Sequence, residues 1–282
     1  MHEAVAQALP RQRQGRNRYL VIGAAMVILF GCLAFGGSAI APYDPTSQDL
    51  LALLERPSAA HWFGTDEIGR DIFSRILAGA RITMTIALAP VALAGLVGVV
   101  IGLVAGYLGG KVDRILSGLL ELMMTIPDLV FAIAVVAVVG ASATGLVVAI
   151  TVSSTPRLAR LIRSRVRELR EEDYVSAAIV LGLPVPRILL AHVLPNTLSI
   201  VIIQLSLLAG QAVLIGSALG FLGLGVQPPA PEWGSMLGAG RQYIEIAPHV
   251  VIAPGIAIAA LVFAFNTLGD GLRDRFDPNL KS

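Results

Sequence analysis

Residues 82–108 read ITMTIALAPVALAGLVGVVIGLVAGYL, and this uncharged stretch decides the class of fold. About 20 apolar residues in a helix span the ~30 Å hydrocarbon core of a bilayer. Five further apolar runs of comparable length follow the same pattern, at residues 19–41, 115–139, 143–161, 197–222 and 250–268. The chain is 55% hydrophobic and 14% charged, far from the composition of soluble domains. We therefore predict an all-α membrane protein with six transmembrane helices, because a β-barrel would show short alternating segments instead.

The lysines and arginines predict the orientation of these six spans. If both termini are cytoplasmic, sixteen of the 21 basic residues fall in cytoplasmic segments. The five on the outer side are Arg56, Arg70, Arg75, Arg81 and Arg241. Because cytoplasmic loops carry an excess of Lys and Arg, we predict a multi-pass protein of the cytoplasmic (inner) membrane, with cytoplasmic tails at 1–18 and 271–282. A signal peptide is disfavoured at the start of the chain, because the apolar run is too long and further spans follow.

Residues 42–81 form a predicted periplasmic or extracellular segment. Its second part, GTDEIGRDIFSRILAGAR, has the pattern of an amphipathic helix, with Thr65 as N-cap and two acidic residues in the first turn. The apolar face of this helix consists of Ile68, Ile72 and Ile76. Such a helix is expected to lie in the membrane interface. The remaining residues, 82–270, are predicted to form the core domain with five of the six spans.

Glycines at every fourth position predict close packing between helices. They are Gly98, Gly102 and Gly106 in the second span and Gly216 and Gly220 in the fifth. In the third span, Pro127 is expected to produce a kink, because proline removes a helical hydrogen bond.

Polar side chains inside the spans are candidates for lining a pathway, namely Gln204, Gln211 and Asn266. The two glutamines are seven residues apart and so share a helix face. Hydrogen bonding between helices is the alternative role. Glu121 and Asp128 in the third span suggest the proton relay of a secondary transporter. The alternative is that Glu121 pairs with a nearby arginine, while Asp128 satisfies backbone groups freed by the proline or faces a wet cavity.

The apolar pattern is interrupted by EEDYVSAAIVLGLPVPRILLAHVLPN, residues 171–196, within a predicted cytoplasmic loop at 164–196. Acidic residues at its start favour a helix N-terminus, and Gly182 followed by Pro184 ends that helix. Its apolar stripe at helical spacing consists of Tyr174, Ala177, Ala178 and Leu181. A second short helix is predicted from about Pro186 to Leu194, after which Pro195 and Asn196 turn the chain back into the membrane.

The stretch YVSAAIVLGLPVPRILLAHVLPN resembles the EAA…G…LP loop of permease subunits of ABC importers. The matching positions are Ala177, Ala178, Gly182, Leu194 and Pro195, whereas Ser176 stands where the motif has Glu. The resemblance implies a type I ABC importer (MetI-like) permease fold and a coupling helix that docks into an ATPase subunit. The residues expected to take part in this coupling are Glu171, Asp173, Tyr174, Ala177, Ala178, Leu181, Gly182, Leu194 and Pro195.

Three further blocks resemble one branch of this family, the second permease subunit of dipeptide, oligopeptide and nickel importers. They read HWFGTDEIGRDIFSRILAGAR, GFLGLGVQPPAPEWGSML and FNTLGDGLRDRFDPNLK. The resemblance implies a homologous second permease, two ATP-binding subunits, an extracytoplasmic solute-binding protein and membrane lipid as partners, with no nucleic acid. It implies peptide import by alternating access. A nickel or glutathione importer of the same family is the alternative, followed by a proton-coupled secondary transporter or a structural membrane scaffold.

The sequence also bears on whether this chain carries catalytic chemistry of its own. The nearest match to a phosphate-binding G-x-x-x-x-G-K-[ST] motif, AGYLGGKV, lacks the first glycine and ends in Val112. No H-E-x-x-H, G-x-S-x-G or C-x-x-C occurs, Cys32 is the single cysteine, and the four histidines lack metal-ligand spacing. We therefore predict no catalytic residue, no metal and no bound cofactor, with ATP and Mg²⁺ used by the partner subunits.

Overall fold

The computed structural model describes the backbone of residues 11–276 and the side chains of residues 18–276. Within that part of the chain all regular structure is helical. The elements are α1 (Arg11–Ile40), α2 (Ile72–Leu108), α3 (Gly110–Met124), α4 (Asp128–Val139), α5 (Ala143–Arg170), α6 (Asp173–Val180), α7 (Val185–Ile188), the π-helical turn η1 (Leu189–Val193), α8 (Leu194–Phe221), α9 (Trp233–Gly240), the 3₁₀ turn η2 (Arg241–Tyr243) and α10 (His249–Phe276).

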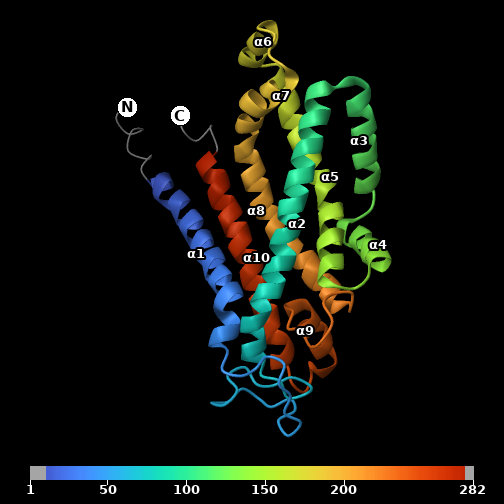
Figure 1. Ribbon diagram of the computed structural model, residues 1–282. Helices are drawn as coiled ribbons and strands as arrows, with labels where there is room; N and C mark the ends of the chain where they lie inside the picture. Colours follow the sequence, from blue (N-terminus) through green and yellow to red (C-terminus); the bar gives the residue numbers. More distant parts are fainter. Residues whose placement is uncertain (1–10, 277–282) are drawn as a thin grey trace, which may run out of the picture.

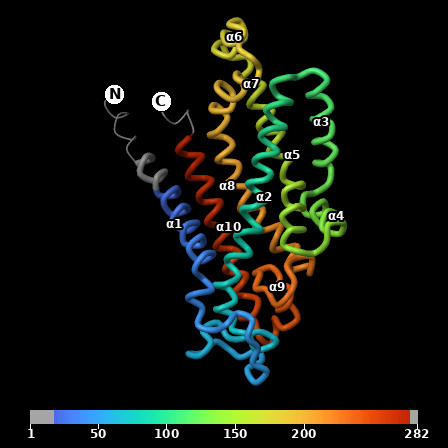
Figure 2. The backbone as a smooth tube through the Cα atoms, in the orientation of Figure 1, coloured from blue at the N-terminus to red at the C-terminus, as the bar shows by residue number. Residues whose placement is uncertain are grey.

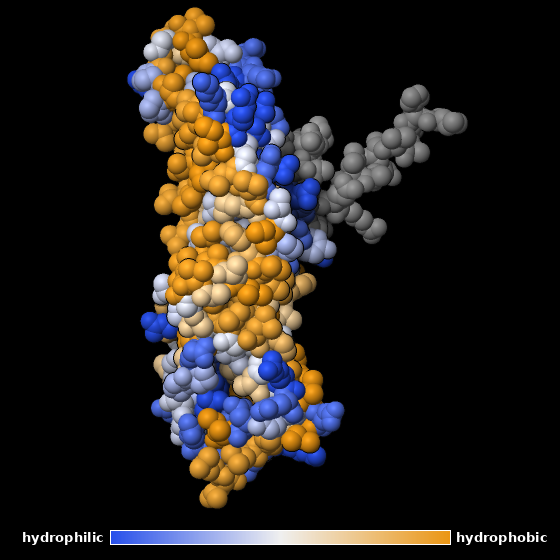
Figure 3. Space-filling model, turned by 90° about the vertical axis from the view of Figure 1, so that its right-hand side faces the viewer, coloured by the Kyte–Doolittle hydropathy of each residue, from blue (hydrophilic) through white to orange (hydrophobic). Residues whose placement is uncertain are grey.

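Five long helices, α1, α2, α5, α8 and α10, run side by side along the molecule (Figures 1 and 2). We call the end that carries α6 the α6 end, and the opposite end, with residues 41–71 and 222–248, the loop end. An apolar band separates polar surfaces near these two ends (Figure 3). Each of the five helices has the length and composition to cross a membrane. The all-helical membrane fold predicted from the sequence is thereby confirmed.

The third predicted span is broken rather than gently kinked. Helices α3 and α4 meet at an angle of 93° across Thr125, Ile126 and Pro127. Pro127 lacks an N–H and disfavours helical geometry in the residue before it, so the helix stops there. Figure 1 shows the pair leading the chain from the end of α2 back toward the start of α5. Counted as one crossing, the pair brings the number of spans to six.

The interfacial helix predicted at residues 65–81 is wrong in position and role. The helix begins at Ile72, capped by Asp71, whose carboxylate accepts the Ser74 N–H at 2.8 Å, and it continues as the long helix α2. Thr65 is instead buried and forms an isolated antiparallel β-bridge with Asp71. The first turns of α2 are buried as well, with Ile72 only 1% exposed, because residues 42–71 fold over them. A helix covered in this way cannot lie on a membrane surface.

Several predicted boundaries move because helices continue into the loops. Helix α5 extends nine residues beyond the predicted span end at 161 and so takes up the start of the loop 164–196. Helix α1 begins at Arg11 within the predicted tail 1–18, and α10 ends at Phe276 within the predicted tail 271–282. The remainder of both tails, 1–10 and 277–282, lies outside the described residues. Helix α1 begins and α10 ends on the same side of the apolar band as α6 (Figure 1).

A seam of glycines on α2 joins it to α5. A Cβ atom on Gly102 would lie 2.7 Å from Ile162 Cβ, and one on Gly106 would lie 2.8 Å from Val166 Cβ. At Gly98 the corresponding distance to Leu158 is 3.2 Å. Such spacing lets the two backbones approach far more closely than larger residues would allow.

The two glycines of the fifth predicted span make separate contacts at the loop end. Gly216 on α8 lies against Ile86 of α2, and Gly220 lies against Glu232. The adjoining Trp233 is 1% exposed, donates from Nε1 to the Ile76 carbonyl at 3.0 Å, and packs edge-on against Phe30. Trp233 is therefore a core residue that fastens α9 to α2.

Substitution of Gly102 by Ala tests this seam. The added methyl group would overlap Ile162 and the Ala159 carbonyl, so we expect the free energy of unfolding to fall by about 1–3 kcal/mol. Thermal unfolding of the purified protein in detergent measures the change. The matched control is Gly118→Ala in α3, where a Cβ meets nothing within 4 Å and stability should hold or rise slightly. Equal unfolding temperatures for the Gly102 variant and wild type would contradict the packing argument.

Candidate functional site

The segment 171–196 forms a compact helical hairpin at the α6 end (Figure 1). Helix α6 begins at Asp173, directly after Glu171 and Glu172, and is followed by its C-cap Leu181. The N–H of Gly182 donates to the Ile179 carbonyl at 2.9 Å, and the N–H of Leu183 donates to the Ala178 carbonyl at 3.1 Å. This pair of bonds is a Schellman motif, which requires the left-handed backbone found at Gly182, with φ of +74°. The helix stop predicted at Gly182 is where the structure has it.

The predicted apolar stripe of α6 divides between two faces. Val175 and Ala178 are buried, in one apolar cluster with Leu169 of α5 and Ile188 of α7. Ala178, expected on the docking stripe, therefore packs against its own bundle. Its other expected members, Tyr174, Ala177 and Leu181, are exposed.

The exposed side of α6 is strongly apolar. Val180 and Leu181 are 86% and 80% exposed, and Ile179 and Tyr174 are also exposed. These side chains form an apolar cap on the tip of the molecule, beyond the polar surface of the α6 end (Figure 3). We call Tyr174, Ile179, Val180 and Leu181 the α6 tip. Glu171 and Asp173 are exposed beside it.

After α6 the chain does not turn back at Pro195, contrary to the prediction. Helix α7, the π-helical turn η1 and α8 follow one another without a break and are long and apolar enough to act as one span, Val185–Phe221. Pro195 lies in the first turn of α8, where a missing N–H is tolerated, and the wider π turn precedes it. The Asn196 amide donates to the His192 carbonyl at 2.7 Å. Leu194 is half-buried and Pro195 is exposed.

A cavity of about 690 Å³ lies between α5, α8 and α10 toward the α6 end. Its lining includes Ser164, Arg165, Glu168, Asn196, Gln204 and Arg273. Gln204, a predicted pathway residue, therefore faces this space. Asn266 is exposed on α10, and its Oδ1 would lie 2.9 Å from a Cβ at Gly210.

The other glutamine belongs to an ion-pair cluster within the spans. Arg157 of α5 donates to Asp128 Oδ2 at 2.6 Å and to Gln211 Oε1 at 2.8 Å. Arg157 is one of the sixteen basic residues that were assigned to cytoplasmic segments, although it lies within the predicted span 143–161. Asp128 was expected either to satisfy backbone groups or to face a wet cavity. Its partner in the structure is instead the Arg157 guanidinium. Glu121 lies beside Arg160 and Arg163, around a small hollow between α3 and α5.

Further charged contacts hold the α6 end together. Arg163 pairs with Asp113 and so ties α5 to α3. Arg165 pairs with Glu168 at 2.8 Å within α5, and the Arg170 guanidinium lies over the Tyr107 ring, 5.7 Å from its centroid. The basic run of α5 thus serves partly in packing, beyond its value as an orientation signal.

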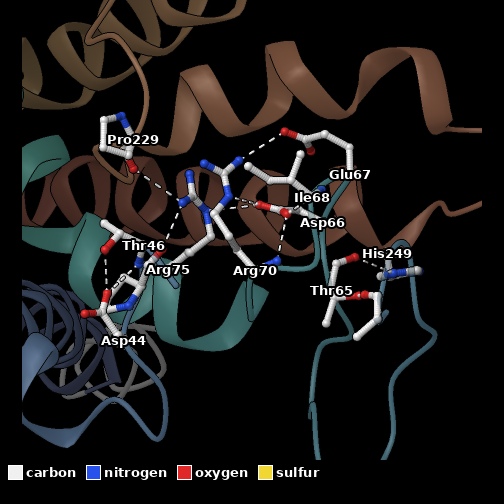
Figure 4. A network of polar contacts seen from close by, with 12 residues as sticks. Asp44, Thr46, Thr65, Asp66, Glu67, Ile68, Arg70, Arg75, Pro229 and His249 are labelled. Atoms are coloured by element: carbon white, nitrogen blue, oxygen red, sulfur yellow. Dashed lines mark hydrogen bonds and ion pairs between the residues drawn. The ribbon is translucent and has the colours of Figure 1, made fainter. Parts of the chain in front are cut away.

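At the loop end, a buried charge network ties the segment 42–71 to α2 and to the loop before α9 (Figure 4). Asp66 Oδ2 lies 2.6 Å from Arg70 Nε and 3.5 Å from Arg75 Nε, and Glu67 pairs with Arg70 at 3.0 Å. The Arg75 guanidinium also donates to the Pro45 carbonyl at 2.9 Å. The amphipathic pattern of residues 65–81 gave no sign of this network, because its charges face inward.

Glu232 caps α9 from a buried position. It accepts hydrogen bonds from the N–H groups of Gly234 and Ser235, at 2.8 and 2.7 Å, and from the Ser235 hydroxyl at 2.9 Å. Burial raises the pKa of Glu232 above its ordinary value, and these hydrogen bonds oppose that shift in part. The described residues contain no group of three or more His, Cys, Asp or Glu side chains that could hold a metal ion.

Comparison with known proteins places this arrangement in a family. Residues 98–282 match the family described as binding-protein-dependent transport system inner membrane component. The chain is 42% identical over 272 residues to a dipeptide transport system permease protein of Alkalihalophilus pseudofirmus, covering 95% of this chain and 88% of the relative. It is 42% identical over 268 residues to a glutathione transport system permease protein of Pectobacterium atrosepticum, covering 95% and 89%.

A third relative is a di/tripeptide transport system permease protein of Pseudomonas aeruginosa, 40% identical over 277 residues, with 96% of this chain and 91% of the relative covered. All three matches cover nearly the whole chain, so they include the long helices, the segment 171–196 and the loop end.

Substitution of Asp66 by Asn tests the charge network at the loop end. Two buried guanidinium groups would lose their shared carboxylate, and breaking a buried pair costs about 3–5 kcal/mol. We expect a lower thermal unfolding temperature in detergent and faster proteolysis within residues 42–71. The control is Asp44→Asn, an exposed site in the same segment, which should behave as wild type. Unchanged proteolysis of the Asp66 variant would show that the loops are held by other contacts.

Proposed function

This chain belongs to the family of binding-protein-dependent transport system inner membrane components, and we propose that it is the permease subunit through which an ATP-driven importer carries short peptides across the cytoplasmic membrane. Membership of the family makes it a multi-pass inner membrane protein and a non-catalytic subunit of a binding-protein-dependent ABC importer. The substrate, the individual partners and the orientation of the termini belong to the proposal.

Short peptides are the substrate class that the relatives share. Two of them are named for dipeptides or di- and tripeptides, and a third for glutathione, itself a peptide with free charged ends. Glutathione import is the second candidate, because the identity to that relative equals the identity to the dipeptide permease. A nickel importer has no counterpart among these three relatives.

The observation that supports coupling to an ATPase is the α6 tip. Tyr174, Ile179, Val180 and Leu181 expose an apolar surface beyond the membrane band, where water would otherwise surround it. We propose that the α6 end is cytoplasmic and that this tip docks into an ATP-binding subunit, which uses ATP and Mg²⁺. A homologous second permease would dock a second ATP-binding subunit, and a solute-binding protein would deliver substrate at the loop end.

The hairpin is connected to the membrane spans in such a way that a displacement of α6 would move α5 and α8. Its buried side chains Val175 and Ala178 pack against α5, and its C-terminal side leads directly into the continuous α7–α8 helix. Both α5 and α8 line the cavity that holds Gln204. ATP binding would shift the equilibrium between two arrangements of these helices because it favours one docked position of α6.

The proton-coupled alternative is weakened by the surroundings of its two acids. Asp128 is held by Arg157 at 2.6 Å, and Glu121 lies beside Arg160 and Arg163. A relay would have to break these charged contacts before either carboxylate could take up a proton. A structural scaffold, the remaining alternative, gives no reason for the exposed apolar α6 tip.

Substrate import is tested by reconstitution. Proteoliposomes containing this chain, its co-encoded permease and ATP-binding subunits, and the solute-binding protein should accumulate a labelled dipeptide only when ATP is supplied. Uptake of labelled glutathione under the same conditions decides between the two substrate candidates. Accumulation driven by a proton gradient without ATP would contradict the proposal.

Docking of the α6 tip is tested by a site-specific crosslink. A cysteine at Leu181 in a Cys32→Ser background should form an adduct with an ATP-binding subunit, with a yield that changes when ATP is added. The matched control is a cysteine at Ala178, one turn away but buried against the bundle, which should form little adduct. If the Leu181 variant transports normally yet never crosslinks, α6 does not carry the coupling.

A further inference from the structure

The cluster formed by Arg157, Asp128 and Gln211 joins three helices. Asp128 opens α4 directly after the 93° break, Arg157 lies midway along α5, and Gln211 belongs to α8. Arg157 uses Nη2 for Asp128 and Nη1 for Gln211, at 2.6 and 2.8 Å. The cluster is partly open, since the Arg157 and Asp128 side chains are 42% and 34% exposed.

The cluster lies deep within the apolar band. At 1.5 Å per residue, Arg157 is roughly 21 Å along α5 from its start near the loop end, and Gln211 is roughly 15 Å along α8 from its end there. Measured from that end across a ~30 Å hydrocarbon core, Gln211 lies at about the middle and Arg157 about two-thirds of the way across, so the cluster is within the core. Charged side chains at that depth face a bundle interior or a water-filled space, because contact with lipid tails is too costly. The exposed side of this cluster therefore points away from lipid.

Polar groups continue from the cluster toward the α6 end. Gln204 stands two helical turns from Gln211 on α8, and it lines the 690 Å³ cavity together with Arg165 and Arg273. We call these polar groups on α5 and α8 the polar strip, although apolar side chains such as Leu207 lie between them. Such a strip is what a hydrophilic solute needs when it crosses between two permease subunits.

We propose that Arg157 and Asp128 form a transient binding site for the charged ends of a peptide in transit, with Arg157 taking the α-carboxylate and Asp128 the α-ammonium group. The proposal rests on the peptide import proposed above and specifies where this chain contacts its substrate. The planar guanidinium suits a carboxylate, with which it forms paired hydrogen bonds. Gln211 acts as a positioning residue, because its Oε1 accepts from Nη1 and so orients the guanidinium.

The resting ion pair explains how such a site stays stable and releases its ligand. Without substrate, each charge satisfies the other, so no unpaired charge stands in the membrane. A zwitterionic peptide replaces one ion pair by two of the same kind, and the resting pair re-forms when the peptide leaves. The exchange keeps net affinity low, as passage through a pathway requires.

The alternative is that the pair only clamps α4 to α5. The double variant Asp128→Asn/Arg157→Gln separates the two roles, because it removes both charges while keeping groups that can hydrogen-bond to each other. If the pair binds substrate, ATP-dependent dipeptide uptake by the reconstituted importer should fall at least tenfold, while thermal unfolding and co-purification of the ATP-binding subunits stay as in wild type. The matched control, Asp113→Asn/Arg163→Gln, removes the α3–α5 ion pair outside this strip and should retain uptake within about twofold.

Two outcomes would overturn the site. One is uptake within twofold of wild type in the double variant. The other is loss of uptake together with a lowered unfolding temperature or loss of the partner subunits, which assigns the pair to a clamp. The single variant Arg157→Lys keeps the charge but loses the planar fork. Its uptake should lie between that of the double variant and that of wild type. Failure of the wild-type importer to carry any peptide is a different result, because it refutes the proposed function itself.

Discussion

The close approach of α2 and α5 is the contact on which the rest of the structure depends. Gly102 and Gly106 bring the two backbones together, and Ile162 and Val166 fill the space left by the missing side chains. Helix α5 carries the ion pair with α4 near its middle, one wall of the large cavity, and the buried attachment of α6 at its end. The position of every proposed functional group relative to the bundle is therefore set along this seam.

The coupling role that we propose for the hairpin after α5 sets two opposite requirements, and each of its two faces suits one of them. A lever must be fixed to the part that it moves, and the buried Val175 and Ala178 provide that attachment. It must also present a surface to a partner, and the exposed Val180 and Leu181 provide that surface. Gly182 makes this division possible, because its left-handed backbone ends the helix within one residue and returns the chain to the bundle.

The sequence allowed a good prediction of features that depend on local chemistry. The apolar runs, the helix stop at Gly182 and the position of the disturbance at Pro127, though not the 93° break there, follow from hydropathy or backbone restrictions within a few residues. The errors concern features set by distant parts of the chain. Periodicity could not show that residues 42–71 cover the start of α2, or which side of α6 is buried. Trp233, similarly, is buried by α1 and α2, which lie more than 100 residues before it.

Arg157 shows the same limit at the candidate substrate site. Five more arginines follow it between residues 160 and 170, and positive charge near the end of a span ordinarily marks the cytoplasmic side. Only the 93° bend, which brings Asp128 against α5, gives this arginine a partner deep in the bundle. A count of charges along the chain cannot distinguish an orientation signal from a paired charge inside the membrane.

Two of the ion-pair clusters in the described part of the chain illustrate how burial sets the role of a charge. Asp66 and Arg70 at the loop end have side chains only 6% and 5% exposed, so separating them would break a pair that water cannot replace. Asp128 and Arg157 are partly open, so an incoming carboxylate and ammonium group can replace each partner as it moves away. A buried pair fixes a loop, whereas an open pair at mid-membrane can exchange partners. The import of zwitterionic peptides that we propose would use both, a fixed loop end and a pathway whose charges are satisfied before, during and after each passage.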